Sequence, residues 1–341
     1  MIPPVDANPK SLAIYLSNKC NLSCGYCYVA AGRSAEAFLT LSQIVSVIDH
    51  FMSSPADFQK KVLFLGGEPM TNYALLRQAI SYTRRSYGQK LSVHVFTNGL
   101  GLNSESLNFF AENRVELLIS PHGRDVRLPR DIKGIQTGAV IIVRPKSVSS
   151  LPRQAHNLFI SGWRKIIISI DTVSLWQESE AFQLERALKG LLHYYKSLIH
   201  LRIHPFEISN LSDISAHSIC SQMILGSDGF FYPCDKLLGT EAPYLKRWRI
   251  GSADRGPDRR TLERHQNLAA RAIIKALPDF AYGLGGGCPL GVYWLWQAQS
   301  REYNDFLERA KNFRLVSAIF SDFLSHLRIQ MFGNRKLERD S

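Results

Sequence analysis

The sequence predicts an α/β fold in which a mostly parallel sheet is covered by helices. Apolar runs of strand length alternate with stretches of helical periodicity as far as about Ile208, which is the pattern of repeated βα units. Several of these runs are uninterrupted, as in strands that are buried on both faces. Parallel strands end at one edge of their sheet, so we expect the polar residues that follow them to share one mouth.

The elements follow one another in a regular order. The predicted strands are residues 11–16, 61–65, 91–96, 115–120, 138–143, 165–171 and a last extended segment at 201–208. The predicted helices are residues 39–52, with Thr40 or Ser42 as cap, then 72–87, 104–113, 154–160 and 180–198, followed by 300–311 and 315–332. A glycine-containing turn at 227–229 predicts a hairpin between two further short strands.

Length and composition indicate a globular protein. The chain has 341 residues, of which 45% are hydrophobic and 21% charged, so it is long enough for one large domain and an appendage. No apolar run reaches the length of a membrane span, and the start of the chain lacks the features of a signal peptide. Six cysteines in a chain of this size do not suggest a secreted disulfide framework. We therefore expect a cytoplasmic protein without membrane contact.

The net charge of +12 favours anionic partners. Much of the excess lies between Lys246 and Lys275, which we call the basic segment; it also holds Arg247, Arg249, Arg255, Arg259, Arg260, Arg264 and Arg271. A solvated helix face is the default interpretation, and a docking surface for an acidic peptide is the sharper one. Without interleaved aromatic residues or a nucleic-acid-binding module, nucleic acid is an unlikely partner.

Three cysteines stand close together directly after the first predicted strand. Cys20, Cys24 and Cys27 have the spacing CxxxCxxC, which places three thiolates on one tight loop. Thiolates are the ligands of iron–sulfur clusters, so the loop can hold three corners of a 4Fe–4S cube and leave the fourth iron open. A zinc site is the alternative, but zinc knuckles usually close with a second cysteine or histidine pair nearby.

A glycine-rich string ends the second predicted strand. It reads Gly66-Gly67-Glu68-Pro69. Two glycines at a strand end let a ligand approach the backbone, and a neighbouring carboxylate can accept hydrogen bonds from an ammonium group. A simple turn would also explain the string if it stood alone.

The cysteine loop, with the aromatic Tyr26 before its last cysteine, resembles the signature loop of the radical S-adenosylmethionine (SAM) enzymes. In that family the open iron binds the amino and carboxylate groups of SAM, and the aromatic residue packs near the adenine. The string Gly66-Gly67-Glu68-Pro69 resembles the family's second motif, which holds the SAM amino group. The resemblance implies an open, partial (β/α)6 TIM-like barrel.

Further strand-end residues extend this resemblance. Thr97-Asn98-Gly99 matches a sequence common after the third strand of peptide-modifying members, which implies that Asn98 lies near SAM. Those members often have Ser-x-Asp-Gly after the fourth strand, where this chain has Ser120, Pro121, His122 and Gly123. His122 could contact the SAM ribose or the substrate, or only bond its own turn. Arg144 could pair with the SAM carboxylate or form a surface salt bridge.

The remaining cysteines are Cys220, Cys234 and Cys288, the last in a Gly-Gly-Gly-Cys-Pro string. Their layout resembles the C-terminal twitch or SPASM extension of radical SAM enzymes, which carries an auxiliary 4Fe–4S cluster. A full SPASM domain has about seven cysteines, and the compact extension usually offers a fourth thiolate that is missing here. The cluster would therefore keep an open iron or take another ligand. Structural zinc with a histidine such as His217 or His265 is the alternative.

The resulting prediction divides the chain into a radical SAM partial barrel at 1–209, a twitch/SPASM-like domain at 210–330 and a charged tail at 331–341. The resemblance implies reductive cleavage of SAM to a 5′-deoxyadenosyl radical, hydrogen abstraction from a ribosomally made precursor peptide, and a reductant such as flavodoxin or ferredoxin. The alternatives are an enzyme acting on a small sugar or aminocyclitol, and a non-catalytic iron–sulfur or zinc-binding regulator. Molybdopterin-precursor cyclases match in length, but their closely spaced second cysteine pair and terminal Gly-Gly are absent.

Overall fold

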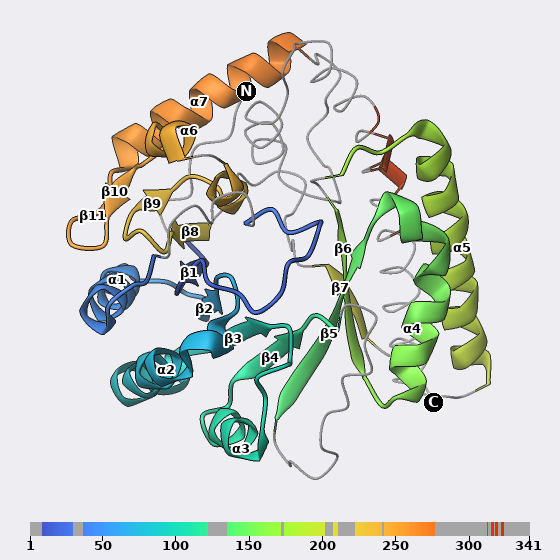
Figure 1. Ribbon diagram of the computed structural model, residues 1–341, viewed down its shortest axis with the longest axis horizontal. Coiled ribbons are helices and arrows are strands. Elements are labelled where there is room, and N and C mark those ends of the chain that lie inside the picture. The colour runs from blue at the N-terminus through green and yellow to red at the C-terminus, as the bar shows by residue number, and fades with distance from the viewer. Residues whose placement is uncertain are drawn as a thin grey trace.

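The fold is built on one curved sheet with helices on its outer side (Figure 1). The computed structural model describes residues 9–29, 37–121, 135–171, 174–201, 207–210, 222–240 and 242–276, together with 312, 315–316, 318–319 and 322–323. Among these residues the main sheet has nine strands in the order β7-β6-β5-β4-β3-β2-β1-β8-β9. All neighbouring pairs are parallel except β8 with β9, so seven strands from β1 to β7 lie in sequence order across the sheet.

The strands of the main sheet are β1 (Ser11–Tyr15), β2 (Lys60–Leu65), β3 (Leu91–Thr97), β4 (Glu116–Ile119), β5 (Gln136–Val143), β6 (Lys165–Ile170), β7 (Glu207–Asn210), β8 (Gln222–Leu225) and β9 (Phe231–Tyr232). A separate two-stranded sheet pairs β10 (Gly251–Ser252) with β11 (Gly256–Pro257). The helices are α1 (Leu41–Ser53), α2 (Tyr73–Tyr87), α3 (Ser104–Glu112), α4 (Leu151–Ile160), α5 (Glu178–His200), α6 (Ala242–Lys246) and α7 (Arg259–Ala276). Helices α1 to α5 lie along the convex side of the strands (Figure 1).

Local sequence sets where several helices begin. Thr40 caps α1, because its side chain accepts from the Gln43 amide and the Gln43 side chain accepts from the Thr40 amide. Asn72 caps α2 and Asn103 caps α3 through bonds from backbone amides. These short polar side chains satisfy amides that have no partner within the helix.

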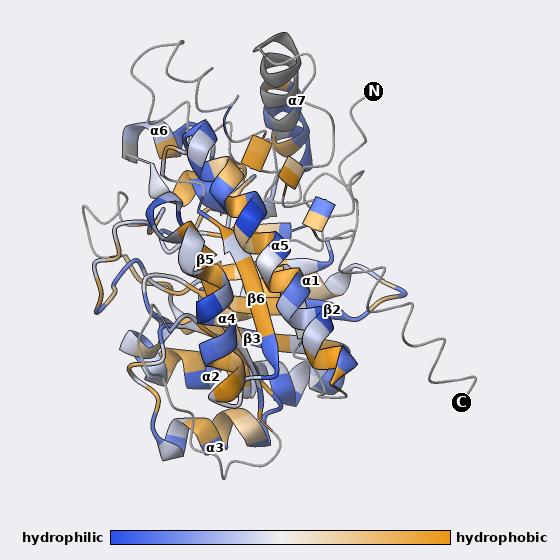
Figure 2. Ribbon diagram, turned by 90° about the vertical axis from the view of Figure 1, so that its right-hand side faces the viewer, coloured by the Kyte–Doolittle hydropathy of each residue, from blue (hydrophilic) through white to orange (hydrophobic). Residues whose placement is uncertain are grey.

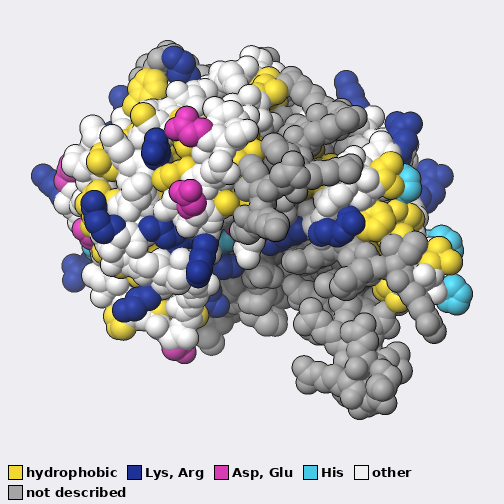
Figure 3. Space-filling view, turned by 90° about the horizontal axis from the view of Figure 1, so that it is seen from below, with side chains coloured by type: hydrophobic (Ala, Val, Ile, Leu, Met, Phe, Trp, Pro, Cys, Tyr) yellow, Lys and Arg dark blue, Asp and Glu magenta, His cyan; other side chains and the backbone are white. Residues whose placement is uncertain are grey.

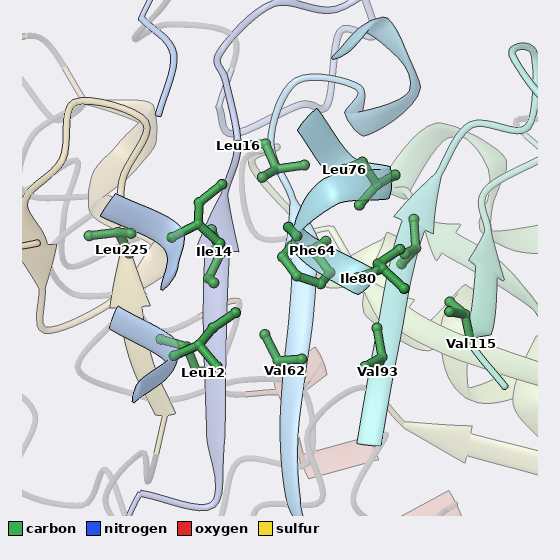
Figure 4. Close-up of a cluster of buried hydrophobic side chains, with 14 of the residues drawn as sticks. Leu12, Ile14, Leu16, Val62, Phe64, Leu76, Ile80, Val93, Val115 and Leu225 are labelled. Carbon is green, nitrogen blue, oxygen red and sulfur yellow. The ribbon is translucent and has the colours of Figure 1, made fainter. Parts of the chain in front are cut away.

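Alternation along the strands divides the core between two faces. Leu12, Ile14 and Leu16 lie in the cluster under α1 and α2, together with Val62 and Phe64 (Figure 4). A second outer cluster joins β5 and β6 to α4 and α5, and Figure 2 shows β6 as mostly hydrophobic between helices of mixed hydropathy. This is the outer layer of a βα sheet, where each strand turns alternate residues toward the helices.

The inner face of the sheet carries two smaller clusters. Leu118, Val140 and Ile167 pack together from β4, β5 and β6. Ala13 and Tyr15 of β1 pack with residues of β8 and β9 in the other cluster. The inner face is therefore filled in part by side chains from successive strands, as in a barrel interior.

The predicted α/β class and parallel sheet are confirmed, and most elements fall within a few residues of their predicted bounds. Of the extended segment predicted at 201–208, residues 207 and 208 lie in β7, Leu201 is the C-cap of α5, and 202–206 lie outside the described residues. Helix α5 ends at His200, two residues beyond its predicted end, because its buried residues Leu191, Tyr195 and Leu198 keep helical spacing.

The hairpin predicted around 227–229 is confirmed, but its place in the fold was not foreseen. Strand β8 pairs in parallel with the free side of β1, and β9 extends the same sheet. The predicted domain boundary at 209/210 stays a prediction. Most of the predicted helices 300–311 and 315–332 lies outside the described residues, although Val316 and Phe323 are helical and pack against the α4–α5 cluster.

No helix in the described part of the chain is long and apolar enough to cross a membrane.

Candidate radical SAM site

The cysteine loop leaves the carboxyl end of β1. Cys20, Cys24 and Cys27 are all half-buried, and the Cys27 amide donates to the Cys24 carbonyl oxygen at 3.0 Å, which closes a tight turn. The Leu22 amide points at the Cys20 sulfur at 3.4 Å. The three side chains therefore come from one compact loop, and an N–H donor already faces one of the sulfurs.

The glycines after β2 let two backbone segments run side by side. The Gly67 amide donates to the Ser17 carbonyl at 2.8 Å, and the Glu68 amide donates to the Lys19 carbonyl at 2.8 Å. A Cβ atom on Gly66 would collide with the Ser17 carbonyl, and one on Gly67 with the Lys19 carbonyl. Gly66 also has φ +149°, which side chains rarely adopt. The glycine string is thus fitted to the start of the cysteine loop.

Glu68 is buried between the ends of β2 and β3. Its carboxylate accepts from the Thr97 hydroxyl at 2.6 Å, the Asn98 amide at 2.7 Å and the Met70 amide at 3.1 Å. Burial raises the pKa of the Glu68 carboxyl above its ordinary value, and the three hydrogen bonds oppose that rise. Through these hydrogen bonds the Glu68 carboxylate holds the ends of β2 and β3 together. Its predicted contact with the SAM ammonium group stays a prediction.

Asn98 connects the end of β3 to the cysteine loop. Its side-chain amide donates to the Asn21 side-chain oxygen at 2.7 Å, and its own oxygen accepts from the Leu100 amide at 2.9 Å. Glu68 fixes the Asn98 backbone, and Asn98 fixes Asn21, which follows Cys20 directly. The three motifs that the sequence singles out are therefore connected by hydrogen bonds.

Arg144 and Tyr26 meet across the mouth of the sheet. The guanidinium group of Arg144, after β5, lies 5.1 Å from the centroid of the Tyr26 ring in the cysteine loop, which is a cation–π contact. Three strands lie between β5 and β1 in the sheet, so this contact requires the sheet to curve. The predicted pairing of Arg144 with the SAM carboxylate stays a prediction, but its guanidinium lies beside the residue expected near the adenine.

Two further predicted residues line the same edge. Pro69 is buried directly after Glu68 and starts a short 3-10 helix. The Ser120 amide donates to the Thr97 carbonyl at 2.9 Å, so Ser120 lies beside the end of β3. His122 lies outside the described residues.

Of the second cysteine set, the structure describes Cys234 alone. Cys234 is buried after β9, and its sulfur lies 3.5 Å from the Asp235 carboxylate. Cys220, Cys288 and His217 lie outside the described residues. Within the described part of the chain, the buried Nδ1 of His265 has no hydrogen-bond partner, and burial lowers the pKa of this histidine. Whether an auxiliary cluster or zinc binds here stays a prediction.

A partly buried polar network beside the cysteine loop was missed by the sequence analysis. The hydroxyl groups of Tyr15 and Tyr28 lie 2.6 Å apart, and the Tyr28 hydroxyl donates to the Asp235 carboxylate at 2.9 Å. Burial, then the nearby Asp235 charge, raises the pKa of both tyrosines, so both keep their protons. Tyr28 follows Cys27 and Asp235 follows Cys234, which is the one signal that could have found them. Asn21 was missed in the same way.

The residues present fit a cluster and SAM by the chemistry of their donors. Three cysteine sulfurs supply soft ligands on one loop, although among the described residues no three cysteine, histidine or carboxylate side chains are gathered closely enough to hold a metal ion. Beside them, Gly66 and Gly67 keep the backbone bare, and an aromatic ring and a guanidinium group stand nearby.

A family model supports this assignment. Residues 14–142 match the model described as Radical SAM superfamily, and this segment contains the cysteine loop, the glycine string and Asn98. Residues 14–142, which are about two-fifths of the chain, are therefore similar to the radical SAM superfamily.

Two curated proteins are similar over about a third of the chain. The radical SAM cyclopropyl synthase TigE of Paramaledivibacter caminithermalis is 22% identical over 125 residues, which cover 33% of this chain and 26% of that protein. A probable GTP 3′,8-cyclase of Methanocella arvoryzae is 31% identical over 117 residues, which cover 34% of this chain and 36% of that protein. The chain thus spans well under half the length of these relatives.

A solved structure shares the fold over most of the chain. It is described as native anSMEcpe with bound AdoMet, and it matches with a TM-score of 0.59 and 16% identity over 91% of this chain and 99% of that chain. The same protein with bound AdoMet and Cp18Cys peptide gives the same TM-score and covers 93% of this chain. These likenesses show the fold and support the predicted partial barrel.

Proposed function

We propose that this protein is a radical SAM enzyme that reductively cleaves SAM and abstracts a hydrogen atom from a bound substrate. Cys20, Cys24 and Cys27 would hold the 4Fe–4S cluster. The observation that carries this proposal is that hydrogen bonds join the cysteine loop, the glycine string and Asn98 at one edge of the sheet. The cluster, when bound and reduced, supplies the electron that cleaves SAM.

The chain's own residues would bind SAM and orient it beside the cysteine loop. Gly66 and Gly67 would hold the glycine string close against the start of the cysteine loop, while Tyr26 offers a ring to the adenine. Arg144 supplies positive charge for a carboxylate on the opposite side of the mouth. Asn98 keeps the loop at a fixed distance from β3, which is the kind of positioning that lowers the entropic cost of reaction.

For the substrate we favour a ribosomally made precursor peptide, in which the enzyme would form a crosslink or thioether. The twitch/SPASM-like layout of Cys220, Cys234 and Cys288 supports this assignment, because enzymes with that extension most often modify peptides; the three cysteines would hold an auxiliary 4Fe–4S cluster. A protein of the same fold is described with a bound peptide. We expect the enzyme to work in the reducing cytoplasm with flavodoxin or ferredoxin as reductant.

The basic segment offers a surface for an acidic part of such a peptide. Arg249 does not contribute, because it is paired with Asp228 at 2.9 Å and covers the Phe230 ring. Arg260 and Arg264 on α7 are exposed, whereas the neighbouring Arg259 is bonded to Glu263. Positive charge is not confined to α7, since Figure 3 shows a face on which Lys and Arg side chains outnumber Asp and Glu.

The docking idea is tested by charge reversal. Arg260→Glu with Arg264→Glu should weaken binding of an acidic precursor peptide at low salt by about tenfold or more, because opposite charges are replaced by like charges. The matched control is Arg153→Glu with Arg186→Glu, which changes the same charge on the exposed surfaces of α4 and α5. Equal affinity in both double variants would refute docking on α7.

A second candidate is an enzyme acting on a small metabolite, such as a sugar, aminocyclitol or nucleotide. The similarity to a probable GTP 3′,8-cyclase favours it. Gene neighbourhood separates the two readings, because a short open reading frame beside the gene favours a peptide and sugar-biosynthesis genes favour a small molecule.

The enzyme class is tested by metal content and SAM cleavage. After anaerobic reconstitution we expect about eight irons per chain, which should fall to about four in a Cys20/Cys24/Cys27→Ala variant if both clusters form. Dithionite should yield 5′-deoxyadenosine from SAM with wild type but not with the variant. About four irons and one zinc would make the extension a structural zinc site. Zinc alone would refute the radical SAM assignment and leave a zinc-binding regulator.

A further inference from the structure

The segment that carries Cys234 is built onto the cysteine loop through three side chains, of which one is buried and two are half-buried. Tyr15 comes from β1, Tyr28 follows Cys27, and Asp235 follows Cys234. The Tyr28 hydroxyl bridges the other two, at 2.6 Å from the Tyr15 hydroxyl and 2.9 Å from the Asp235 carboxylate, and the Tyr15 hydroxyl lies 3.4 Å from the same carboxylate oxygen. We call these three residues the joint.

Close packing around Tyr28 supports the same connection. Cys234 is followed by the 3-10 helix η5 (Asp235–Gly239), and a Cβ atom on Gly239 would collide with the Tyr28 carbonyl. The Lys236 ammonium group lies 3.9 Å from the centroid of the Tyr28 ring and 3.9 Å from the Asp235 carboxylate. Both ends of η5 therefore contact one residue of the cysteine loop.

The order of the strands explains how the Cys234 segment comes to lie beside the cysteine loop. Strand β8 pairs with β1, the hairpin reverses the chain into β9, and β9 leads directly to Cys234. Tyr15 and the half-buried Cys27 belong to the same inner cluster as Tyr232 and Leu238. A change in the cysteine loop must therefore either move Tyr28 against η5 or be resisted by it.

We propose that Tyr28 and Asp235 are positioning residues that couple the two cysteine sites, so that filling the site of Cys20, Cys24 and Cys27 rigidifies the Cys234 segment. The coupling part of this proposal rests on the proposed function, because it requires that the first site take a cluster. The joint itself does not, since its hydrogen bonds are present in the polypeptide alone.

The joint is tested first in the metal-free full-length chain. Cys234 is 5% exposed, so its alkylation by iodoacetamide should be slow in wild type. Tyr28→Phe removes only the hydroxyl group that bridges Tyr15 and Asp235. Alkylation of Cys234, followed by peptide mass spectrometry, should then become about tenfold faster, because a hydrogen bond to a carboxylate is lost. Asp235→Asn should act in the same direction.

The chain contains a matched control. Asp49 accepts from Tyr82 at 2.5 Å and from Tyr87 at 2.7 Å, which is a second network of two tyrosines and one carboxylate, located on α1 and α2. Tyr87→Phe removes the same kind of bond away from both cysteine sites. It should leave the alkylation rate of Cys234 unchanged, and equal rates in Tyr28→Phe and wild type would refute the joint.

The coupling is tested by hydrogen exchange of residues 222–240 before and after anaerobic reconstitution with iron, sulfide and SAM. Wild type and Tyr87→Phe should gain protection in this segment, whereas Tyr28→Phe should not, at the same iron content of the first site. A Tyr28→Phe protein that gains the wild-type protection overturns the coupling. If wild type takes up no iron, the proposed function and the coupling both fail, while the alkylation result still decides whether the joint exists.

Discussion

Three interacting side chains on β3, β4 and β6 give a measurable prediction for stability. Glu116 on β4 lies 3.1 Å from Nδ1 of His94 on β3 and 2.5 Å from Nζ of Lys165 on β6. The Lys165 side chain reaches Glu116 because Gly138 on β5 leaves space for it, and a Cβ atom there would lie 3.4 Å from Lys165 Cδ. The perturbation is Glu116→Gln, which removes the charge and keeps the shape.

The size of the effect follows from the pKa of Glu116. The bond from His94 first, then the bond from Lys165, lower the pKa of this carboxyl from 4.5 to about 2 against the effect of burial. A difference of about 2.5 pH units corresponds to about 3 kcal/mol of folding stability at neutral pH. The Lys165 side chain is 30% exposed and screened by solvent, so we expect a loss of about 2 kcal/mol in Glu116→Gln.

The pH dependence has a definite sign. A carboxyl whose pKa is lower in the folded state stabilises the fold fully above its unfolded pKa of about 4.5, and this contribution is lost as the pH falls toward about 2. Roughly two-fifths of the difference between wild type and Glu116→Gln should therefore be gone at about pH 3.5.

Urea unfolding of the metal-free chain, monitored by circular dichroism, measures these free energies between about pH 7 and about pH 3.5. The control is Glu105→Gln, because Glu105 is 72% exposed and bonded only to the exposed Arg77 among the contacts described. It should change stability by less than about 0.5 kcal/mol. A Glu116→Gln protein as stable as wild type at neutral pH, or one with the wild-type pH dependence, would refute the reasoning.

Three other substitutions give separate predictions. Gly67→Ala should destabilise the chain by about 2 kcal/mol or more, seen as a lower Tm, because the new Cβ would collide with the Lys19 carbonyl. Asn98→Ala should raise the KM for SAM about tenfold with little loss of Tm, because the 2.7 Å bond to Asn21 positions the cysteine loop. Lys60→Met should cost about 1–3 kcal/mol in urea unfolding, because the buried Lys60 ammonium donates to two backbone carbonyls.

Each of these has its own control and its own contradicting result. Gly190→Ala adds a methyl group at ordinary contact distance inside α5, where alanine favours the helix, so its Tm should not fall; a Gly67→Ala protein with the wild-type Tm would contradict the collision. Asn113→Ala removes a side-chain hydrogen bond to the Phe109 carbonyl at the end of α3 and should leave the KM for SAM unchanged. Equal KM values for Asn98→Ala and wild type would show that Asn98 has no positioning role. Lys61→Met at an exposed position should be neutral, and an equally neutral Lys60→Met would contradict the buried bonds.

Strand and helix positions could be predicted because their periodicity is local. The apolar run from Ser11 to Leu16 predicts β1, and Thr40 and Asn72 stand where caps are needed. The predicted end of α5 at Leu198 falls two residues short of its observed end at His200, because apolar periodicity defines a helix boundary only to within a few residues.

The candidate site was predictable in its motifs and not in its connections. Cys20, Glu68 and Asn98 each follow a predicted strand, which pointed to one edge of the sheet, and the structure places them there. Nothing in the sequence indicates that the Glu68 carboxylate bonds Thr97, since this contact joins two strand ends far apart in the chain. The hydrogen bond between Tyr28 and Asp235 could not be predicted for the same reason, although each residue directly follows a cysteine.

The pairing of β8 with β1 has a consequence for how the chain reaches its fold. Ser11 to Ile14 pair with Gln222 to Leu225, so one edge of the first strand stays open until most of the chain has been synthesised. Contacts this distant in sequence slow folding, and an open apolar edge is a template for pairing with other chains. We therefore expect a late folding step in which the hairpin of β8 and β9 closes this edge, and aggregation of chains that end before residue 222.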